Sequence, residues 1–174
     1  MVMMNRLGPG LAAVGLVAAT LLSVSLAPRE GLAGNPAVDR TNAMIGECVD
    51  RERAAGRSGH ACIGQLSAQC KARPDNAHRA DKMECNEREY VLWALLAENE
   101  LKRLSAALGA AQRAALKKTQ ELWLSYIAEE CRLPYVLFGQ EQGSEWGPAC
   151  SIRHNAARAL ELRAWRDALA GGAK

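Results

Sequence analysis

Residues 116–131 read LKKTQELWLSYIAEEC, and this stretch decides the fold that the sequence predicts. It contains neither Pro nor Gly, and one set of its side chains recurs at steps of three and four residues, so that the set shares one helix face. The set consists of Leu116, Thr119, Gln120, Trp123, Tyr126, Ile127 and Cys131. We expect this face to pack, with Trp123 contributing the largest apolar surface, and we expect the helix to end before Pro134.

A second long helix is predicted immediately before this stretch. It begins near Asp81, whose spacing to Glu84 is that of a capping box, with Asn76 as the rival cap. An apolar stripe at helical spacing follows and consists of Cys85, Tyr90, Trp93, Ala97, Leu101, Leu104 and Leu108. Gly109 is the predicted break. Because the connection is so short, the two helices should lie antiparallel as a hairpin.

The segments outside this hairpin are short or polar. On the N-terminal side we expect a linker at 34–41, a short amphipathic helix at 42–53, one or two helical turns at 61–70 and a loop at 71–78. On the C-terminal side we expect a polar, Gly-rich loop at Gly139–Pro148 (GQEQGSEWGP) and a final helix at 149–169. No segment alternates like a strand. The predicted class is therefore all-α, with about three long helices and short N-terminal helices.

The first 33 residues are predicted to be a secretory signal peptide. Arg6 is the only charged residue among residues 1–10, and residues 11–27 form an uncharged apolar run. Small residues at Gly31 and Ala33 offer a cleavage site before Gly34. A single membrane anchor is the competing interpretation, because a run of about 17 apolar residues is the lower limit for a span. We expect cleavage, and hence a periplasmic or secreted protein that leaves the membrane.

All six cysteines follow this segment: Cys48, Cys62, Cys70, Cys85, Cys131 and Cys150. An even number of cysteines in an exported chain argues for disulfides. Spacing alone does not fix the pairing, but nearest neighbours close the shortest loops: Cys48 with Cys62, Cys70 with Cys85, and Cys131 with Cys150. In the chain-entropy model, each such loop stabilises the fold by about 3 kcal/mol.

A metal site is the alternative use of these residues. His60 and Cys62, with Cys48 and Cys70 nearby, could be assembled into a zinc site. The CxxC pairs that are typical of zinc and redox sites are absent from the sequence, and an exported chain more often oxidises its thiols. We therefore expect no metal.

A set of residues in the predicted hairpin resembles a known family. They are Met83-Glu84-Cys85, Leu104, Gln112–Gln120, Trp123, Tyr126, Glu130-Cys131 and Cys150. On these residues the chain resembles the lysozyme inhibitor LprI-like proteins of bacterial envelopes, although Ile127 stands where that family usually has Arg. The resemblance implies an all-helical, disulfide-stapled domain at 70–170, after a signal peptide at 1–33 and an extension at 34–69. Some members of that family inhibit lysozyme, so the resemblance implies lysozyme as a candidate partner.

The predicted loop at 139–148 is the candidate contact surface. A Cys131–Cys150 disulfide would brace it, so that Glu141, Ser144, Glu145 and Trp146 face a partner. An inhibitor that blocks lysozyme without a covalent bond needs such a rigid projection to fill the catalytic cleft. The alternative function is an envelope interaction module with another protein partner, and the alternative place for Trp146 is against the helices.

Composition and motifs argue against other classes of function. The net charge of +3 is small and gives no basic footprint for nucleic acid. The sequence has no Gly-x-Ser-x-Gly elbow, P-loop or HExxH motif, and Glu129 and Glu130 are adjacent, so they point in different directions on a helix. We expect neither enzymatic activity nor a cofactor, and the sequence leaves the oligomeric state open.

Overall fold

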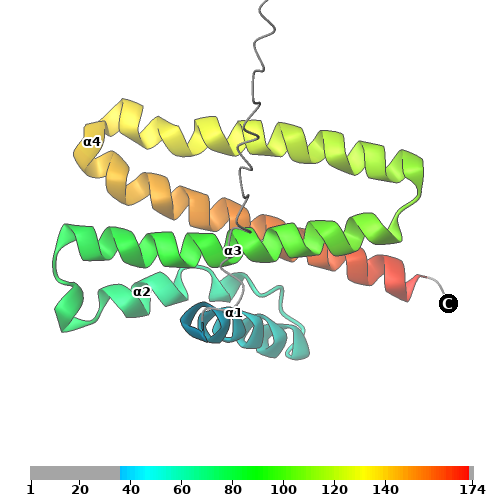
Figure 1. Ribbon diagram of the computed structural model, residues 1–174, viewed down its shortest axis with the longest axis horizontal. Coiled ribbons are helices and arrows are strands. Elements are labelled where there is room, and N and C mark those ends of the chain that lie inside the picture. The colour runs from blue at the N-terminus through cyan, green and yellow to red at the C-terminus, as the bar shows by residue number, and fades with distance from the viewer. Residues whose placement is uncertain (1–35, 173–174) are drawn as a thin grey trace, which may run out of the picture. The chain divides into compact units, whose positions relative to one another are not determined.

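Every regular element of the described residues is helical, as the sequence predicts (Figure 1). The computed structural model describes residues 36–172, and their side chains from residue 43 onward; the predicted signal peptide at 1–33 lies outside them. The elements are α1 (Pro36–Ala54), the 3₁₀ turns η1 (His60–Cys62) and η2 (Pro74–Asn76), and the helices α2 (Gln65–Lys71), α3 (Arg79–Ala107) and α4 (Ala110–Gly171). Among these, no helix is both long and apolar enough to cross a bilayer.

Helix α4 consists of two arms, because its backbone leaves the helical region at one residue. Gly139 has φ 75° and ψ −179°, a conformation that is open to glycine and strained for other residues. The first arm (110–138) and the second arm (140–171) meet at this point, and Figure 1 shows the chain reversing there. Together with α3, the arms make three long helical segments.

The predicted hairpin between α3 and the first arm is confirmed. α3 ends at Ala107, α4 begins at Ala110, and Gly109 between them has extended backbone. The Gln112 side chain accepts a hydrogen bond of 3.0 Å from the Gly109 N–H, which satisfies one of the donors that a helix start leaves free. Four members of the α3 stripe are buried and three are partly buried: Cys85, Trp93, Ala97 and Leu104, then Tyr90, Leu101 and Leu108.

The main core lies between α1, α3 and the second arm of α4. Its buried members are Ile45, Val49, Cys62, Leu92, Trp93, Ala97, Ile152, Ala156, Ala159 and Leu160. A smaller core at the other end of α3 consists of Leu104, Leu116 and Leu162. Burying one large side chain of this kind contributes about 1.5–3 kcal/mol, so α3 and the second arm, which both enter the two clusters, form the centre of the fold.

The prediction that the first arm ends before Pro134 is wrong. The helix continues through Pro134 to Phe138, and the second arm likewise contains Pro148. A proline inside a helix removes one backbone hydrogen bond and costs about 3 kcal/mol. Both prolines lie beside the Cys131–Cys150 disulfide, which joins the arms with a Cα–Cα distance of 5.4 Å. Tertiary bracing therefore outweighs the local signal.

The predicted loop at Gly139–Pro148 is also wrong, because residues 140–148 are helical. Gly143 and Gly147 follow Gly139 at steps of four residues, so they share a helix face, and both pack on Tyr135 of the first arm. A Cβ at Gly143 would lie 2.6 Å from Tyr135 Cα, and one at Gly147 would overlap the Tyr135 ring. The glycines are needed for two helices to approach this closely, and not for a loop.

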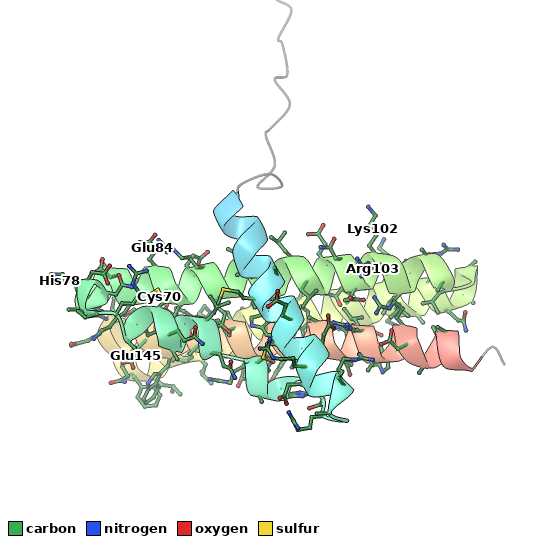
Figure 2. All side chains as sticks on the ribbon, turned by 90° about the horizontal axis from the view of Figure 1, so that it is seen from below. Cys70, His78, Glu84, Lys102, Arg103 and Glu145 are labelled. Carbon is green, nitrogen blue, oxygen red and sulfur yellow. A yellow bond between two sulfur atoms is a disulfide. The ribbon has the colours of Figure 1, made fainter. Side chains whose placement is uncertain are left out.

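The N-terminal extension differs from the prediction at its start. Residues 34–41 are predicted as a linker, but α1 already begins at Pro36, and proline is well tolerated in the first turn of a helix. Figure 2 shows α1 running across α3 and the second arm, and Ile45 and Val49 of α1 enter the main core. The extension is thus an integral part of the fold.

Glu89 of α3 holds the segment after α1 in place. This buried carboxylate accepts hydrogen bonds from the Gly64 N–H at 2.6 Å, the Ser67 N–H at 2.7 Å and the Trp93 indole at 2.9 Å. Hydrogen bonds to a carboxylate are stronger than those to a neutral acceptor. The Glu89 side chain therefore accepts hydrogen bonds both from backbone N–H groups at the start of α2 and from the indole N–H of Trp93, the largest residue of the core.

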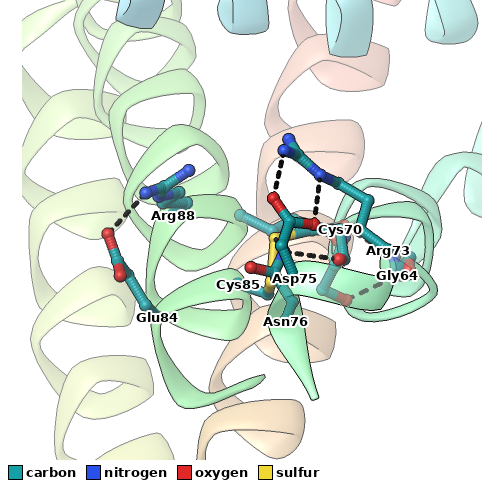
Figure 3. The surroundings of a disulfide bond; sticks show 10 residues. Gly64, Cys70, Arg73, Asp75, Asn76, Glu84, Cys85 and Arg88 are labelled. Carbon is teal, nitrogen blue, oxygen red and sulfur yellow. Dashed lines mark hydrogen bonds and ion pairs between the residues drawn. A yellow bond between two sulfur atoms is a disulfide. The ribbon is translucent and has the colours of Figure 1, made fainter. Parts of the chain in front are cut away.

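The three disulfides join nearest neighbours, as the shortest-loop scheme predicts: Cys48–Cys62, Cys70–Cys85 and Cys131–Cys150. Figure 3 shows the second of them, where Asn76 donates a 2.7 Å hydrogen bond to the Cys70 carbonyl and so closes the turn between α2 and α3. Disulfides form and persist under oxidising conditions. The protein is therefore suited to an oxidising, extracytoplasmic environment.

Candidate functional site

The tip of the α4 hairpin carries a cluster of exposed apolar side chains, which we call the tip face. It consists of Leu133, Leu137 and Phe138 from the first arm and Trp146 from the second. These residues line a groove of about 440 Å³ together with Pro134, Ala149 and Cys150. A contiguous apolar surface of this kind on a small protein is typical of an interaction site.

An aromatic pair sits at the end of this groove. The rings of Phe138 and Trp146 lie 4.9 Å apart between centroids and meet edge to face at 71°. This arrangement is favourable for two aromatic side chains, and it fixes the orientation of both rings before a partner arrives. Trp146 does contact the helices, but it stays more than a third exposed, and so it remains available for contact.

Two anchors hold the tip face rigid. The Cys131–Cys150 disulfide lies directly behind it. Arg79, in the first turn of α3, donates hydrogen bonds to the Ser144 hydroxyl, to the Glu141 carbonyl at 2.5 Å and to the Gln140 carbonyl at 3.3 Å. The second arm is therefore tied at its start both to the first arm and to α3, which reduces the entropy lost when a partner binds.

The four residues predicted to face a partner have different environments. Glu141 and Glu145 are exposed, and Figure 2 shows Glu145 at the same end of the fold as His78. Trp146 belongs to the tip face. Ser144 is buried, and its hydroxyl donates a 2.9 Å hydrogen bond to the Glu141 carbonyl, so Ser144 positions the backbone and does not reach the surface.

The charge of the tip segment differs from that of the chain. Residues 133–152 contain two charged side chains, Glu141 and Glu145, and both are acidic. Two more charged residues, Glu130 and Arg153, line the groove and are opposite in sign. Glu141 and Glu145 line a neighbouring hollow together with Lys71, Arg79 and Lys82, so the apolar tip is surrounded by charges of both signs.

A possible metal-binding set lies close to the tip. The Sγ atoms of Cys131 and Cys150 and a ring nitrogen of His154 lie within 4.8 Å of one another. Zinc takes cysteine as thiolate, and these two sulfurs are bonded to each other. The same is true of Cys48 and Cys62, which the sequence offers beside His60. In the oxidised protein these sulfurs act as structural cross-links.

Sequence reasoning identified Trp146 but missed its partners. Leu133, Leu137 and Phe138 adjoin or follow Pro134, where the sequence predicts the end of the helix. Two signals point to them. Leu133 and Leu137 are four residues apart and so share a helix face, and Phe138 is the only Phe in the chain.

No family model, no curated protein and no solved structure matches the chain. The resemblance to the lysozyme inhibitor LprI-like proteins therefore stays a prediction.

Proposed function

We propose that the protein is an exported, periplasmic binding protein whose tip face docks on an apolar patch of a partner protein. The observation that carries this proposal is the apolar groove of Leu133, Leu137, Phe138 and Trp146, held between two anchored helical arms. Aromatic residues in rigid, shaped surfaces provide much of the free energy of binding at protein interfaces.

The charged side chains beside the tip face are mixed in sign. Glu130 and Arg153 line the groove itself, and Glu141 and Glu145 line a neighbouring hollow with Lys71, Arg79 and Lys82. Exposed charges of this kind mainly raise the association rate and select the partner, whereas the apolar centre provides the affinity. The expected interface is therefore an apolar contact surrounded by charges of both signs on this protein.

Lysozyme is the first candidate partner, because the chain resembles inhibitors of lysozyme at the residues quoted above. The tip is a corner between two helical arms and not a loop, so it would cover the entrance of the catalytic cleft without reaching deep into it. Glu141 and Glu145 would then lie against a basic rim and away from the two catalytic carboxylates, which repel acidic groups. The inhibition would be non-covalent.

The second candidate is an envelope interaction module that binds a protein other than lysozyme. The same tip face would serve this function, and nothing in it requires a cleft on the partner. The two candidates differ in one result, which is the effect of the protein on lysozyme activity.

A turbidity assay with lysozyme separates these candidates. The oxidised protein is compared with Leu137→Asp, which places a charge in the groove, and with Leu124→Asp as a matched control. Leu137 and Leu124 lie on the same arm and are 60% and 51% exposed, but Leu124 does not line the groove. Both variants should therefore fold.

Inhibition by the oxidised protein, lost in Leu137→Asp and kept in Leu124→Asp, would identify lysozyme as the partner. An absence of inhibition by protein shown by circular dichroism to be folded would exclude the lysozyme tested and favour the interaction module. Equal inhibition by both variants would contradict the assignment of the tip face.

A further inference from the structure

A second hollow has a lining that shares no residue with that of the tip groove. It has a volume of about 590 Å³ and lies between the first arm, the second arm and the segment that follows α1. The polar and aromatic side chains that decide its chemistry are Arg53, Arg57, His60, Trp123, His154 and Arg158. Three guanidinium groups thus share a hollow whose lining contains one carboxylate, Glu161.

Arg158 is the innermost of these groups. It is 4% exposed, and its guanidinium lies 5.7 Å from the ring centroid of Trp123 and 5.2 Å from that of Trp165. Its Nε donates to Gln120 at 3.0 Å and its Nη1 to Glu161 at 2.7 Å. The two rings hold the charged plane in one orientation.

The remaining nitrogen of Arg158 has no acceptor among the described residues. Nη2 is buried and makes no hydrogen bond to them. Leaving a buried charged donor unpaired is costly, so an acceptor at this position would be stabilised. Because Nη2 is covered, an acceptor can reach it only if neighbouring side chains move aside.

The mouth of the hollow also has more donors than acceptors. Arg57 donates to Glu52 from Nε at 2.8 Å and from Nη2 at 2.6 Å, which leaves its Nη1 for another acceptor. The hydrogen bond that Arg57 donates to Glu52, and the negative charge of Glu52, raise the pKa of Arg57, so the guanidinium stays charged. Arg53 is paired with Asp167 through one nitrogen. A guanidinium has five N–H donors and no acceptor, so these pairs leave donor capacity unused.

We propose that this hollow binds a small anion with a flat apolar body, such as an aromatic carboxylate. The carboxylate accepts hydrogen bonds from Arg57 at the mouth and, once the side chains that cover Nη2 have moved, from Arg158 inside. The flat body lies on the ring of Trp123 and against Leu160, which also lines the hollow. This inference is independent of the tip face.

Three probes separate the contributions of charge and ring. Benzoate has both, benzyl alcohol has the ring alone, and inorganic phosphate has the charge alone. In titration calorimetry on the oxidised protein, we expect benzoate to bind with a dissociation constant of about 1 mM, as befits so small a ligand, and to bind at least about tenfold more tightly than either of the others. Equal affinities for benzoate and benzyl alcohol would overturn the proposal. So would the absence of benzoate binding at about 10 mM, roughly ten times the expected dissociation constant.

A matched pair of variants locates the site. Arg57 and Arg132 are 61% and 62% exposed, and each donates to a nearby glutamate from Nε and Nη2, but Arg132 lies outside the hollow. Arg57→Gln should weaken benzoate binding about tenfold, the effect of one charged hydrogen bond, and Arg132→Gln should leave it unchanged. Equal effects of the two substitutions would show that benzoate binds elsewhere.

Trp123 provides a spectroscopic readout. Benzoate should change the tryptophan fluorescence of the protein, and Trp123→Phe, which keeps a ring, should abolish most of that change while binding persists in calorimetry. A fluorescence change that survives in Trp123→Phe would contradict contact at this ring. Leu137→Asp, which tests the tip face, should leave benzoate binding intact, so that the two proposals fail or succeed separately.

Discussion

The two arms of α4 have comparable lengths, yet the second arm buries more of its apolar side chains and exposes three large ones, Trp146, Trp165 and Leu169. The second arm buries Ile152, Ala156, Ala159, Leu160 and Leu162 against the rest of the fold. The first arm buries two apolar side chains, those of Leu116 and Cys131, and exposes Leu122, Leu124, Tyr126, Leu133, Val136, Leu137 and Phe138. The second arm packs in the core, whereas the first arm is held in place with most of its large apolar side chains exposed.

This difference shows how a helix can stay ordered while its apolar surface remains exposed. Leu116 holds the start of the first arm in the smaller core, and Cys131 holds its far end through the disulfide. Between these points, Gln120, Trp123 and Ile127 of the predicted packing face are half-buried, whereas Thr119 and Tyr126 are exposed. The apolar surface that folding leaves uncovered is the surface that a partner can cover.

The largest contrast is expected from truncating one leucine on each arm. Leu162 is 0% exposed and Leu122 is 64% exposed. Leu162→Ala should lower the free energy of unfolding by about 2–5 kcal/mol, because it opens a cavity. Leu122→Ala should change it by no more than about 0.5 kcal/mol. Urea denaturation measures both, and similar losses would show that the first arm is packed as tightly as the second.

The disulfide at the tip comes next. Replacing Cys131 and Cys150 together by Ser should cost about 3 kcal/mol in urea denaturation and weaken partner binding, because the arms lose their brace. Replacing Cys48 and Cys62 should cost a similar amount, since the loop is of similar length, but it should leave the tip face intact. If both double variants impaired binding equally, the tip disulfide would have no special role in it.

The close approach of the arms predicts a smaller effect. In Gly147→Ala the added methyl group overlaps the Tyr135 ring, so the substitution should lower the free energy of unfolding by about 1–3 kcal/mol. Gly46→Ala is the control, because nothing lies within 4 Å of an added Cβ there, and it should stabilise α1 by about 0.5–1 kcal/mol. Thermal unfolding that shows no loss in Gly147→Ala would contradict the close crossing of the arms.

The tip is also where sequence reasoning failed, and the reason is physical. Pro134 and the glycines at 139, 143 and 147 are local signals for a helix end and a loop. A disulfide and a tight helix crossing override them, and neither can be derived from local propensity. The four-residue spacing of the glycines was the sequence signal for a close helix contact. The α3 stripe and the break at Gly109 were predictable because local pattern and tertiary packing agree there.

The predicted site shows the same division. Glu141, Glu145 and Trp146 lie at the surface near the groove, whereas Ser144 is buried under Arg79, and no sequence pattern links these two residues. The hollow around Arg158 was not predicted at all. It is built from three separate segments whose proximity depends on the path of both arms and of α1.

The smallest effect concerns pH and the end of the second arm. Partial burial alone would raise the pKa of Asp167, but hydrogen bonds and charges from Arg166 and Arg53 outweigh it and lower the pKa. A carboxyl whose pKa is lower in the folded state stabilises the fold above its unfolded pKa of about 3.9, and this contribution is lost as pH falls through the folded value.

Asp167→Asn should therefore reduce the acid sensitivity of the free energy of unfolding. The effect should stay below about 1 kcal/mol, because the Asp167 side chain is 36% exposed and solvent screens the pair. Urea denaturation at a series of pH values between about 3 and 7 measures it. An unchanged slope in the variant would show that these ion pairs do not contribute to stability.

The central claim is that the tip face is the surface that binds a partner protein. The most direct test places a photo-crosslinking amino acid at position 137, and in a control at position 124, in the protein as it is produced in cells. The account predicts a covalent adduct of one defined mass from position 137 and none from position 124. Adducts from both positions alike, or from position 124 alone, would contradict it.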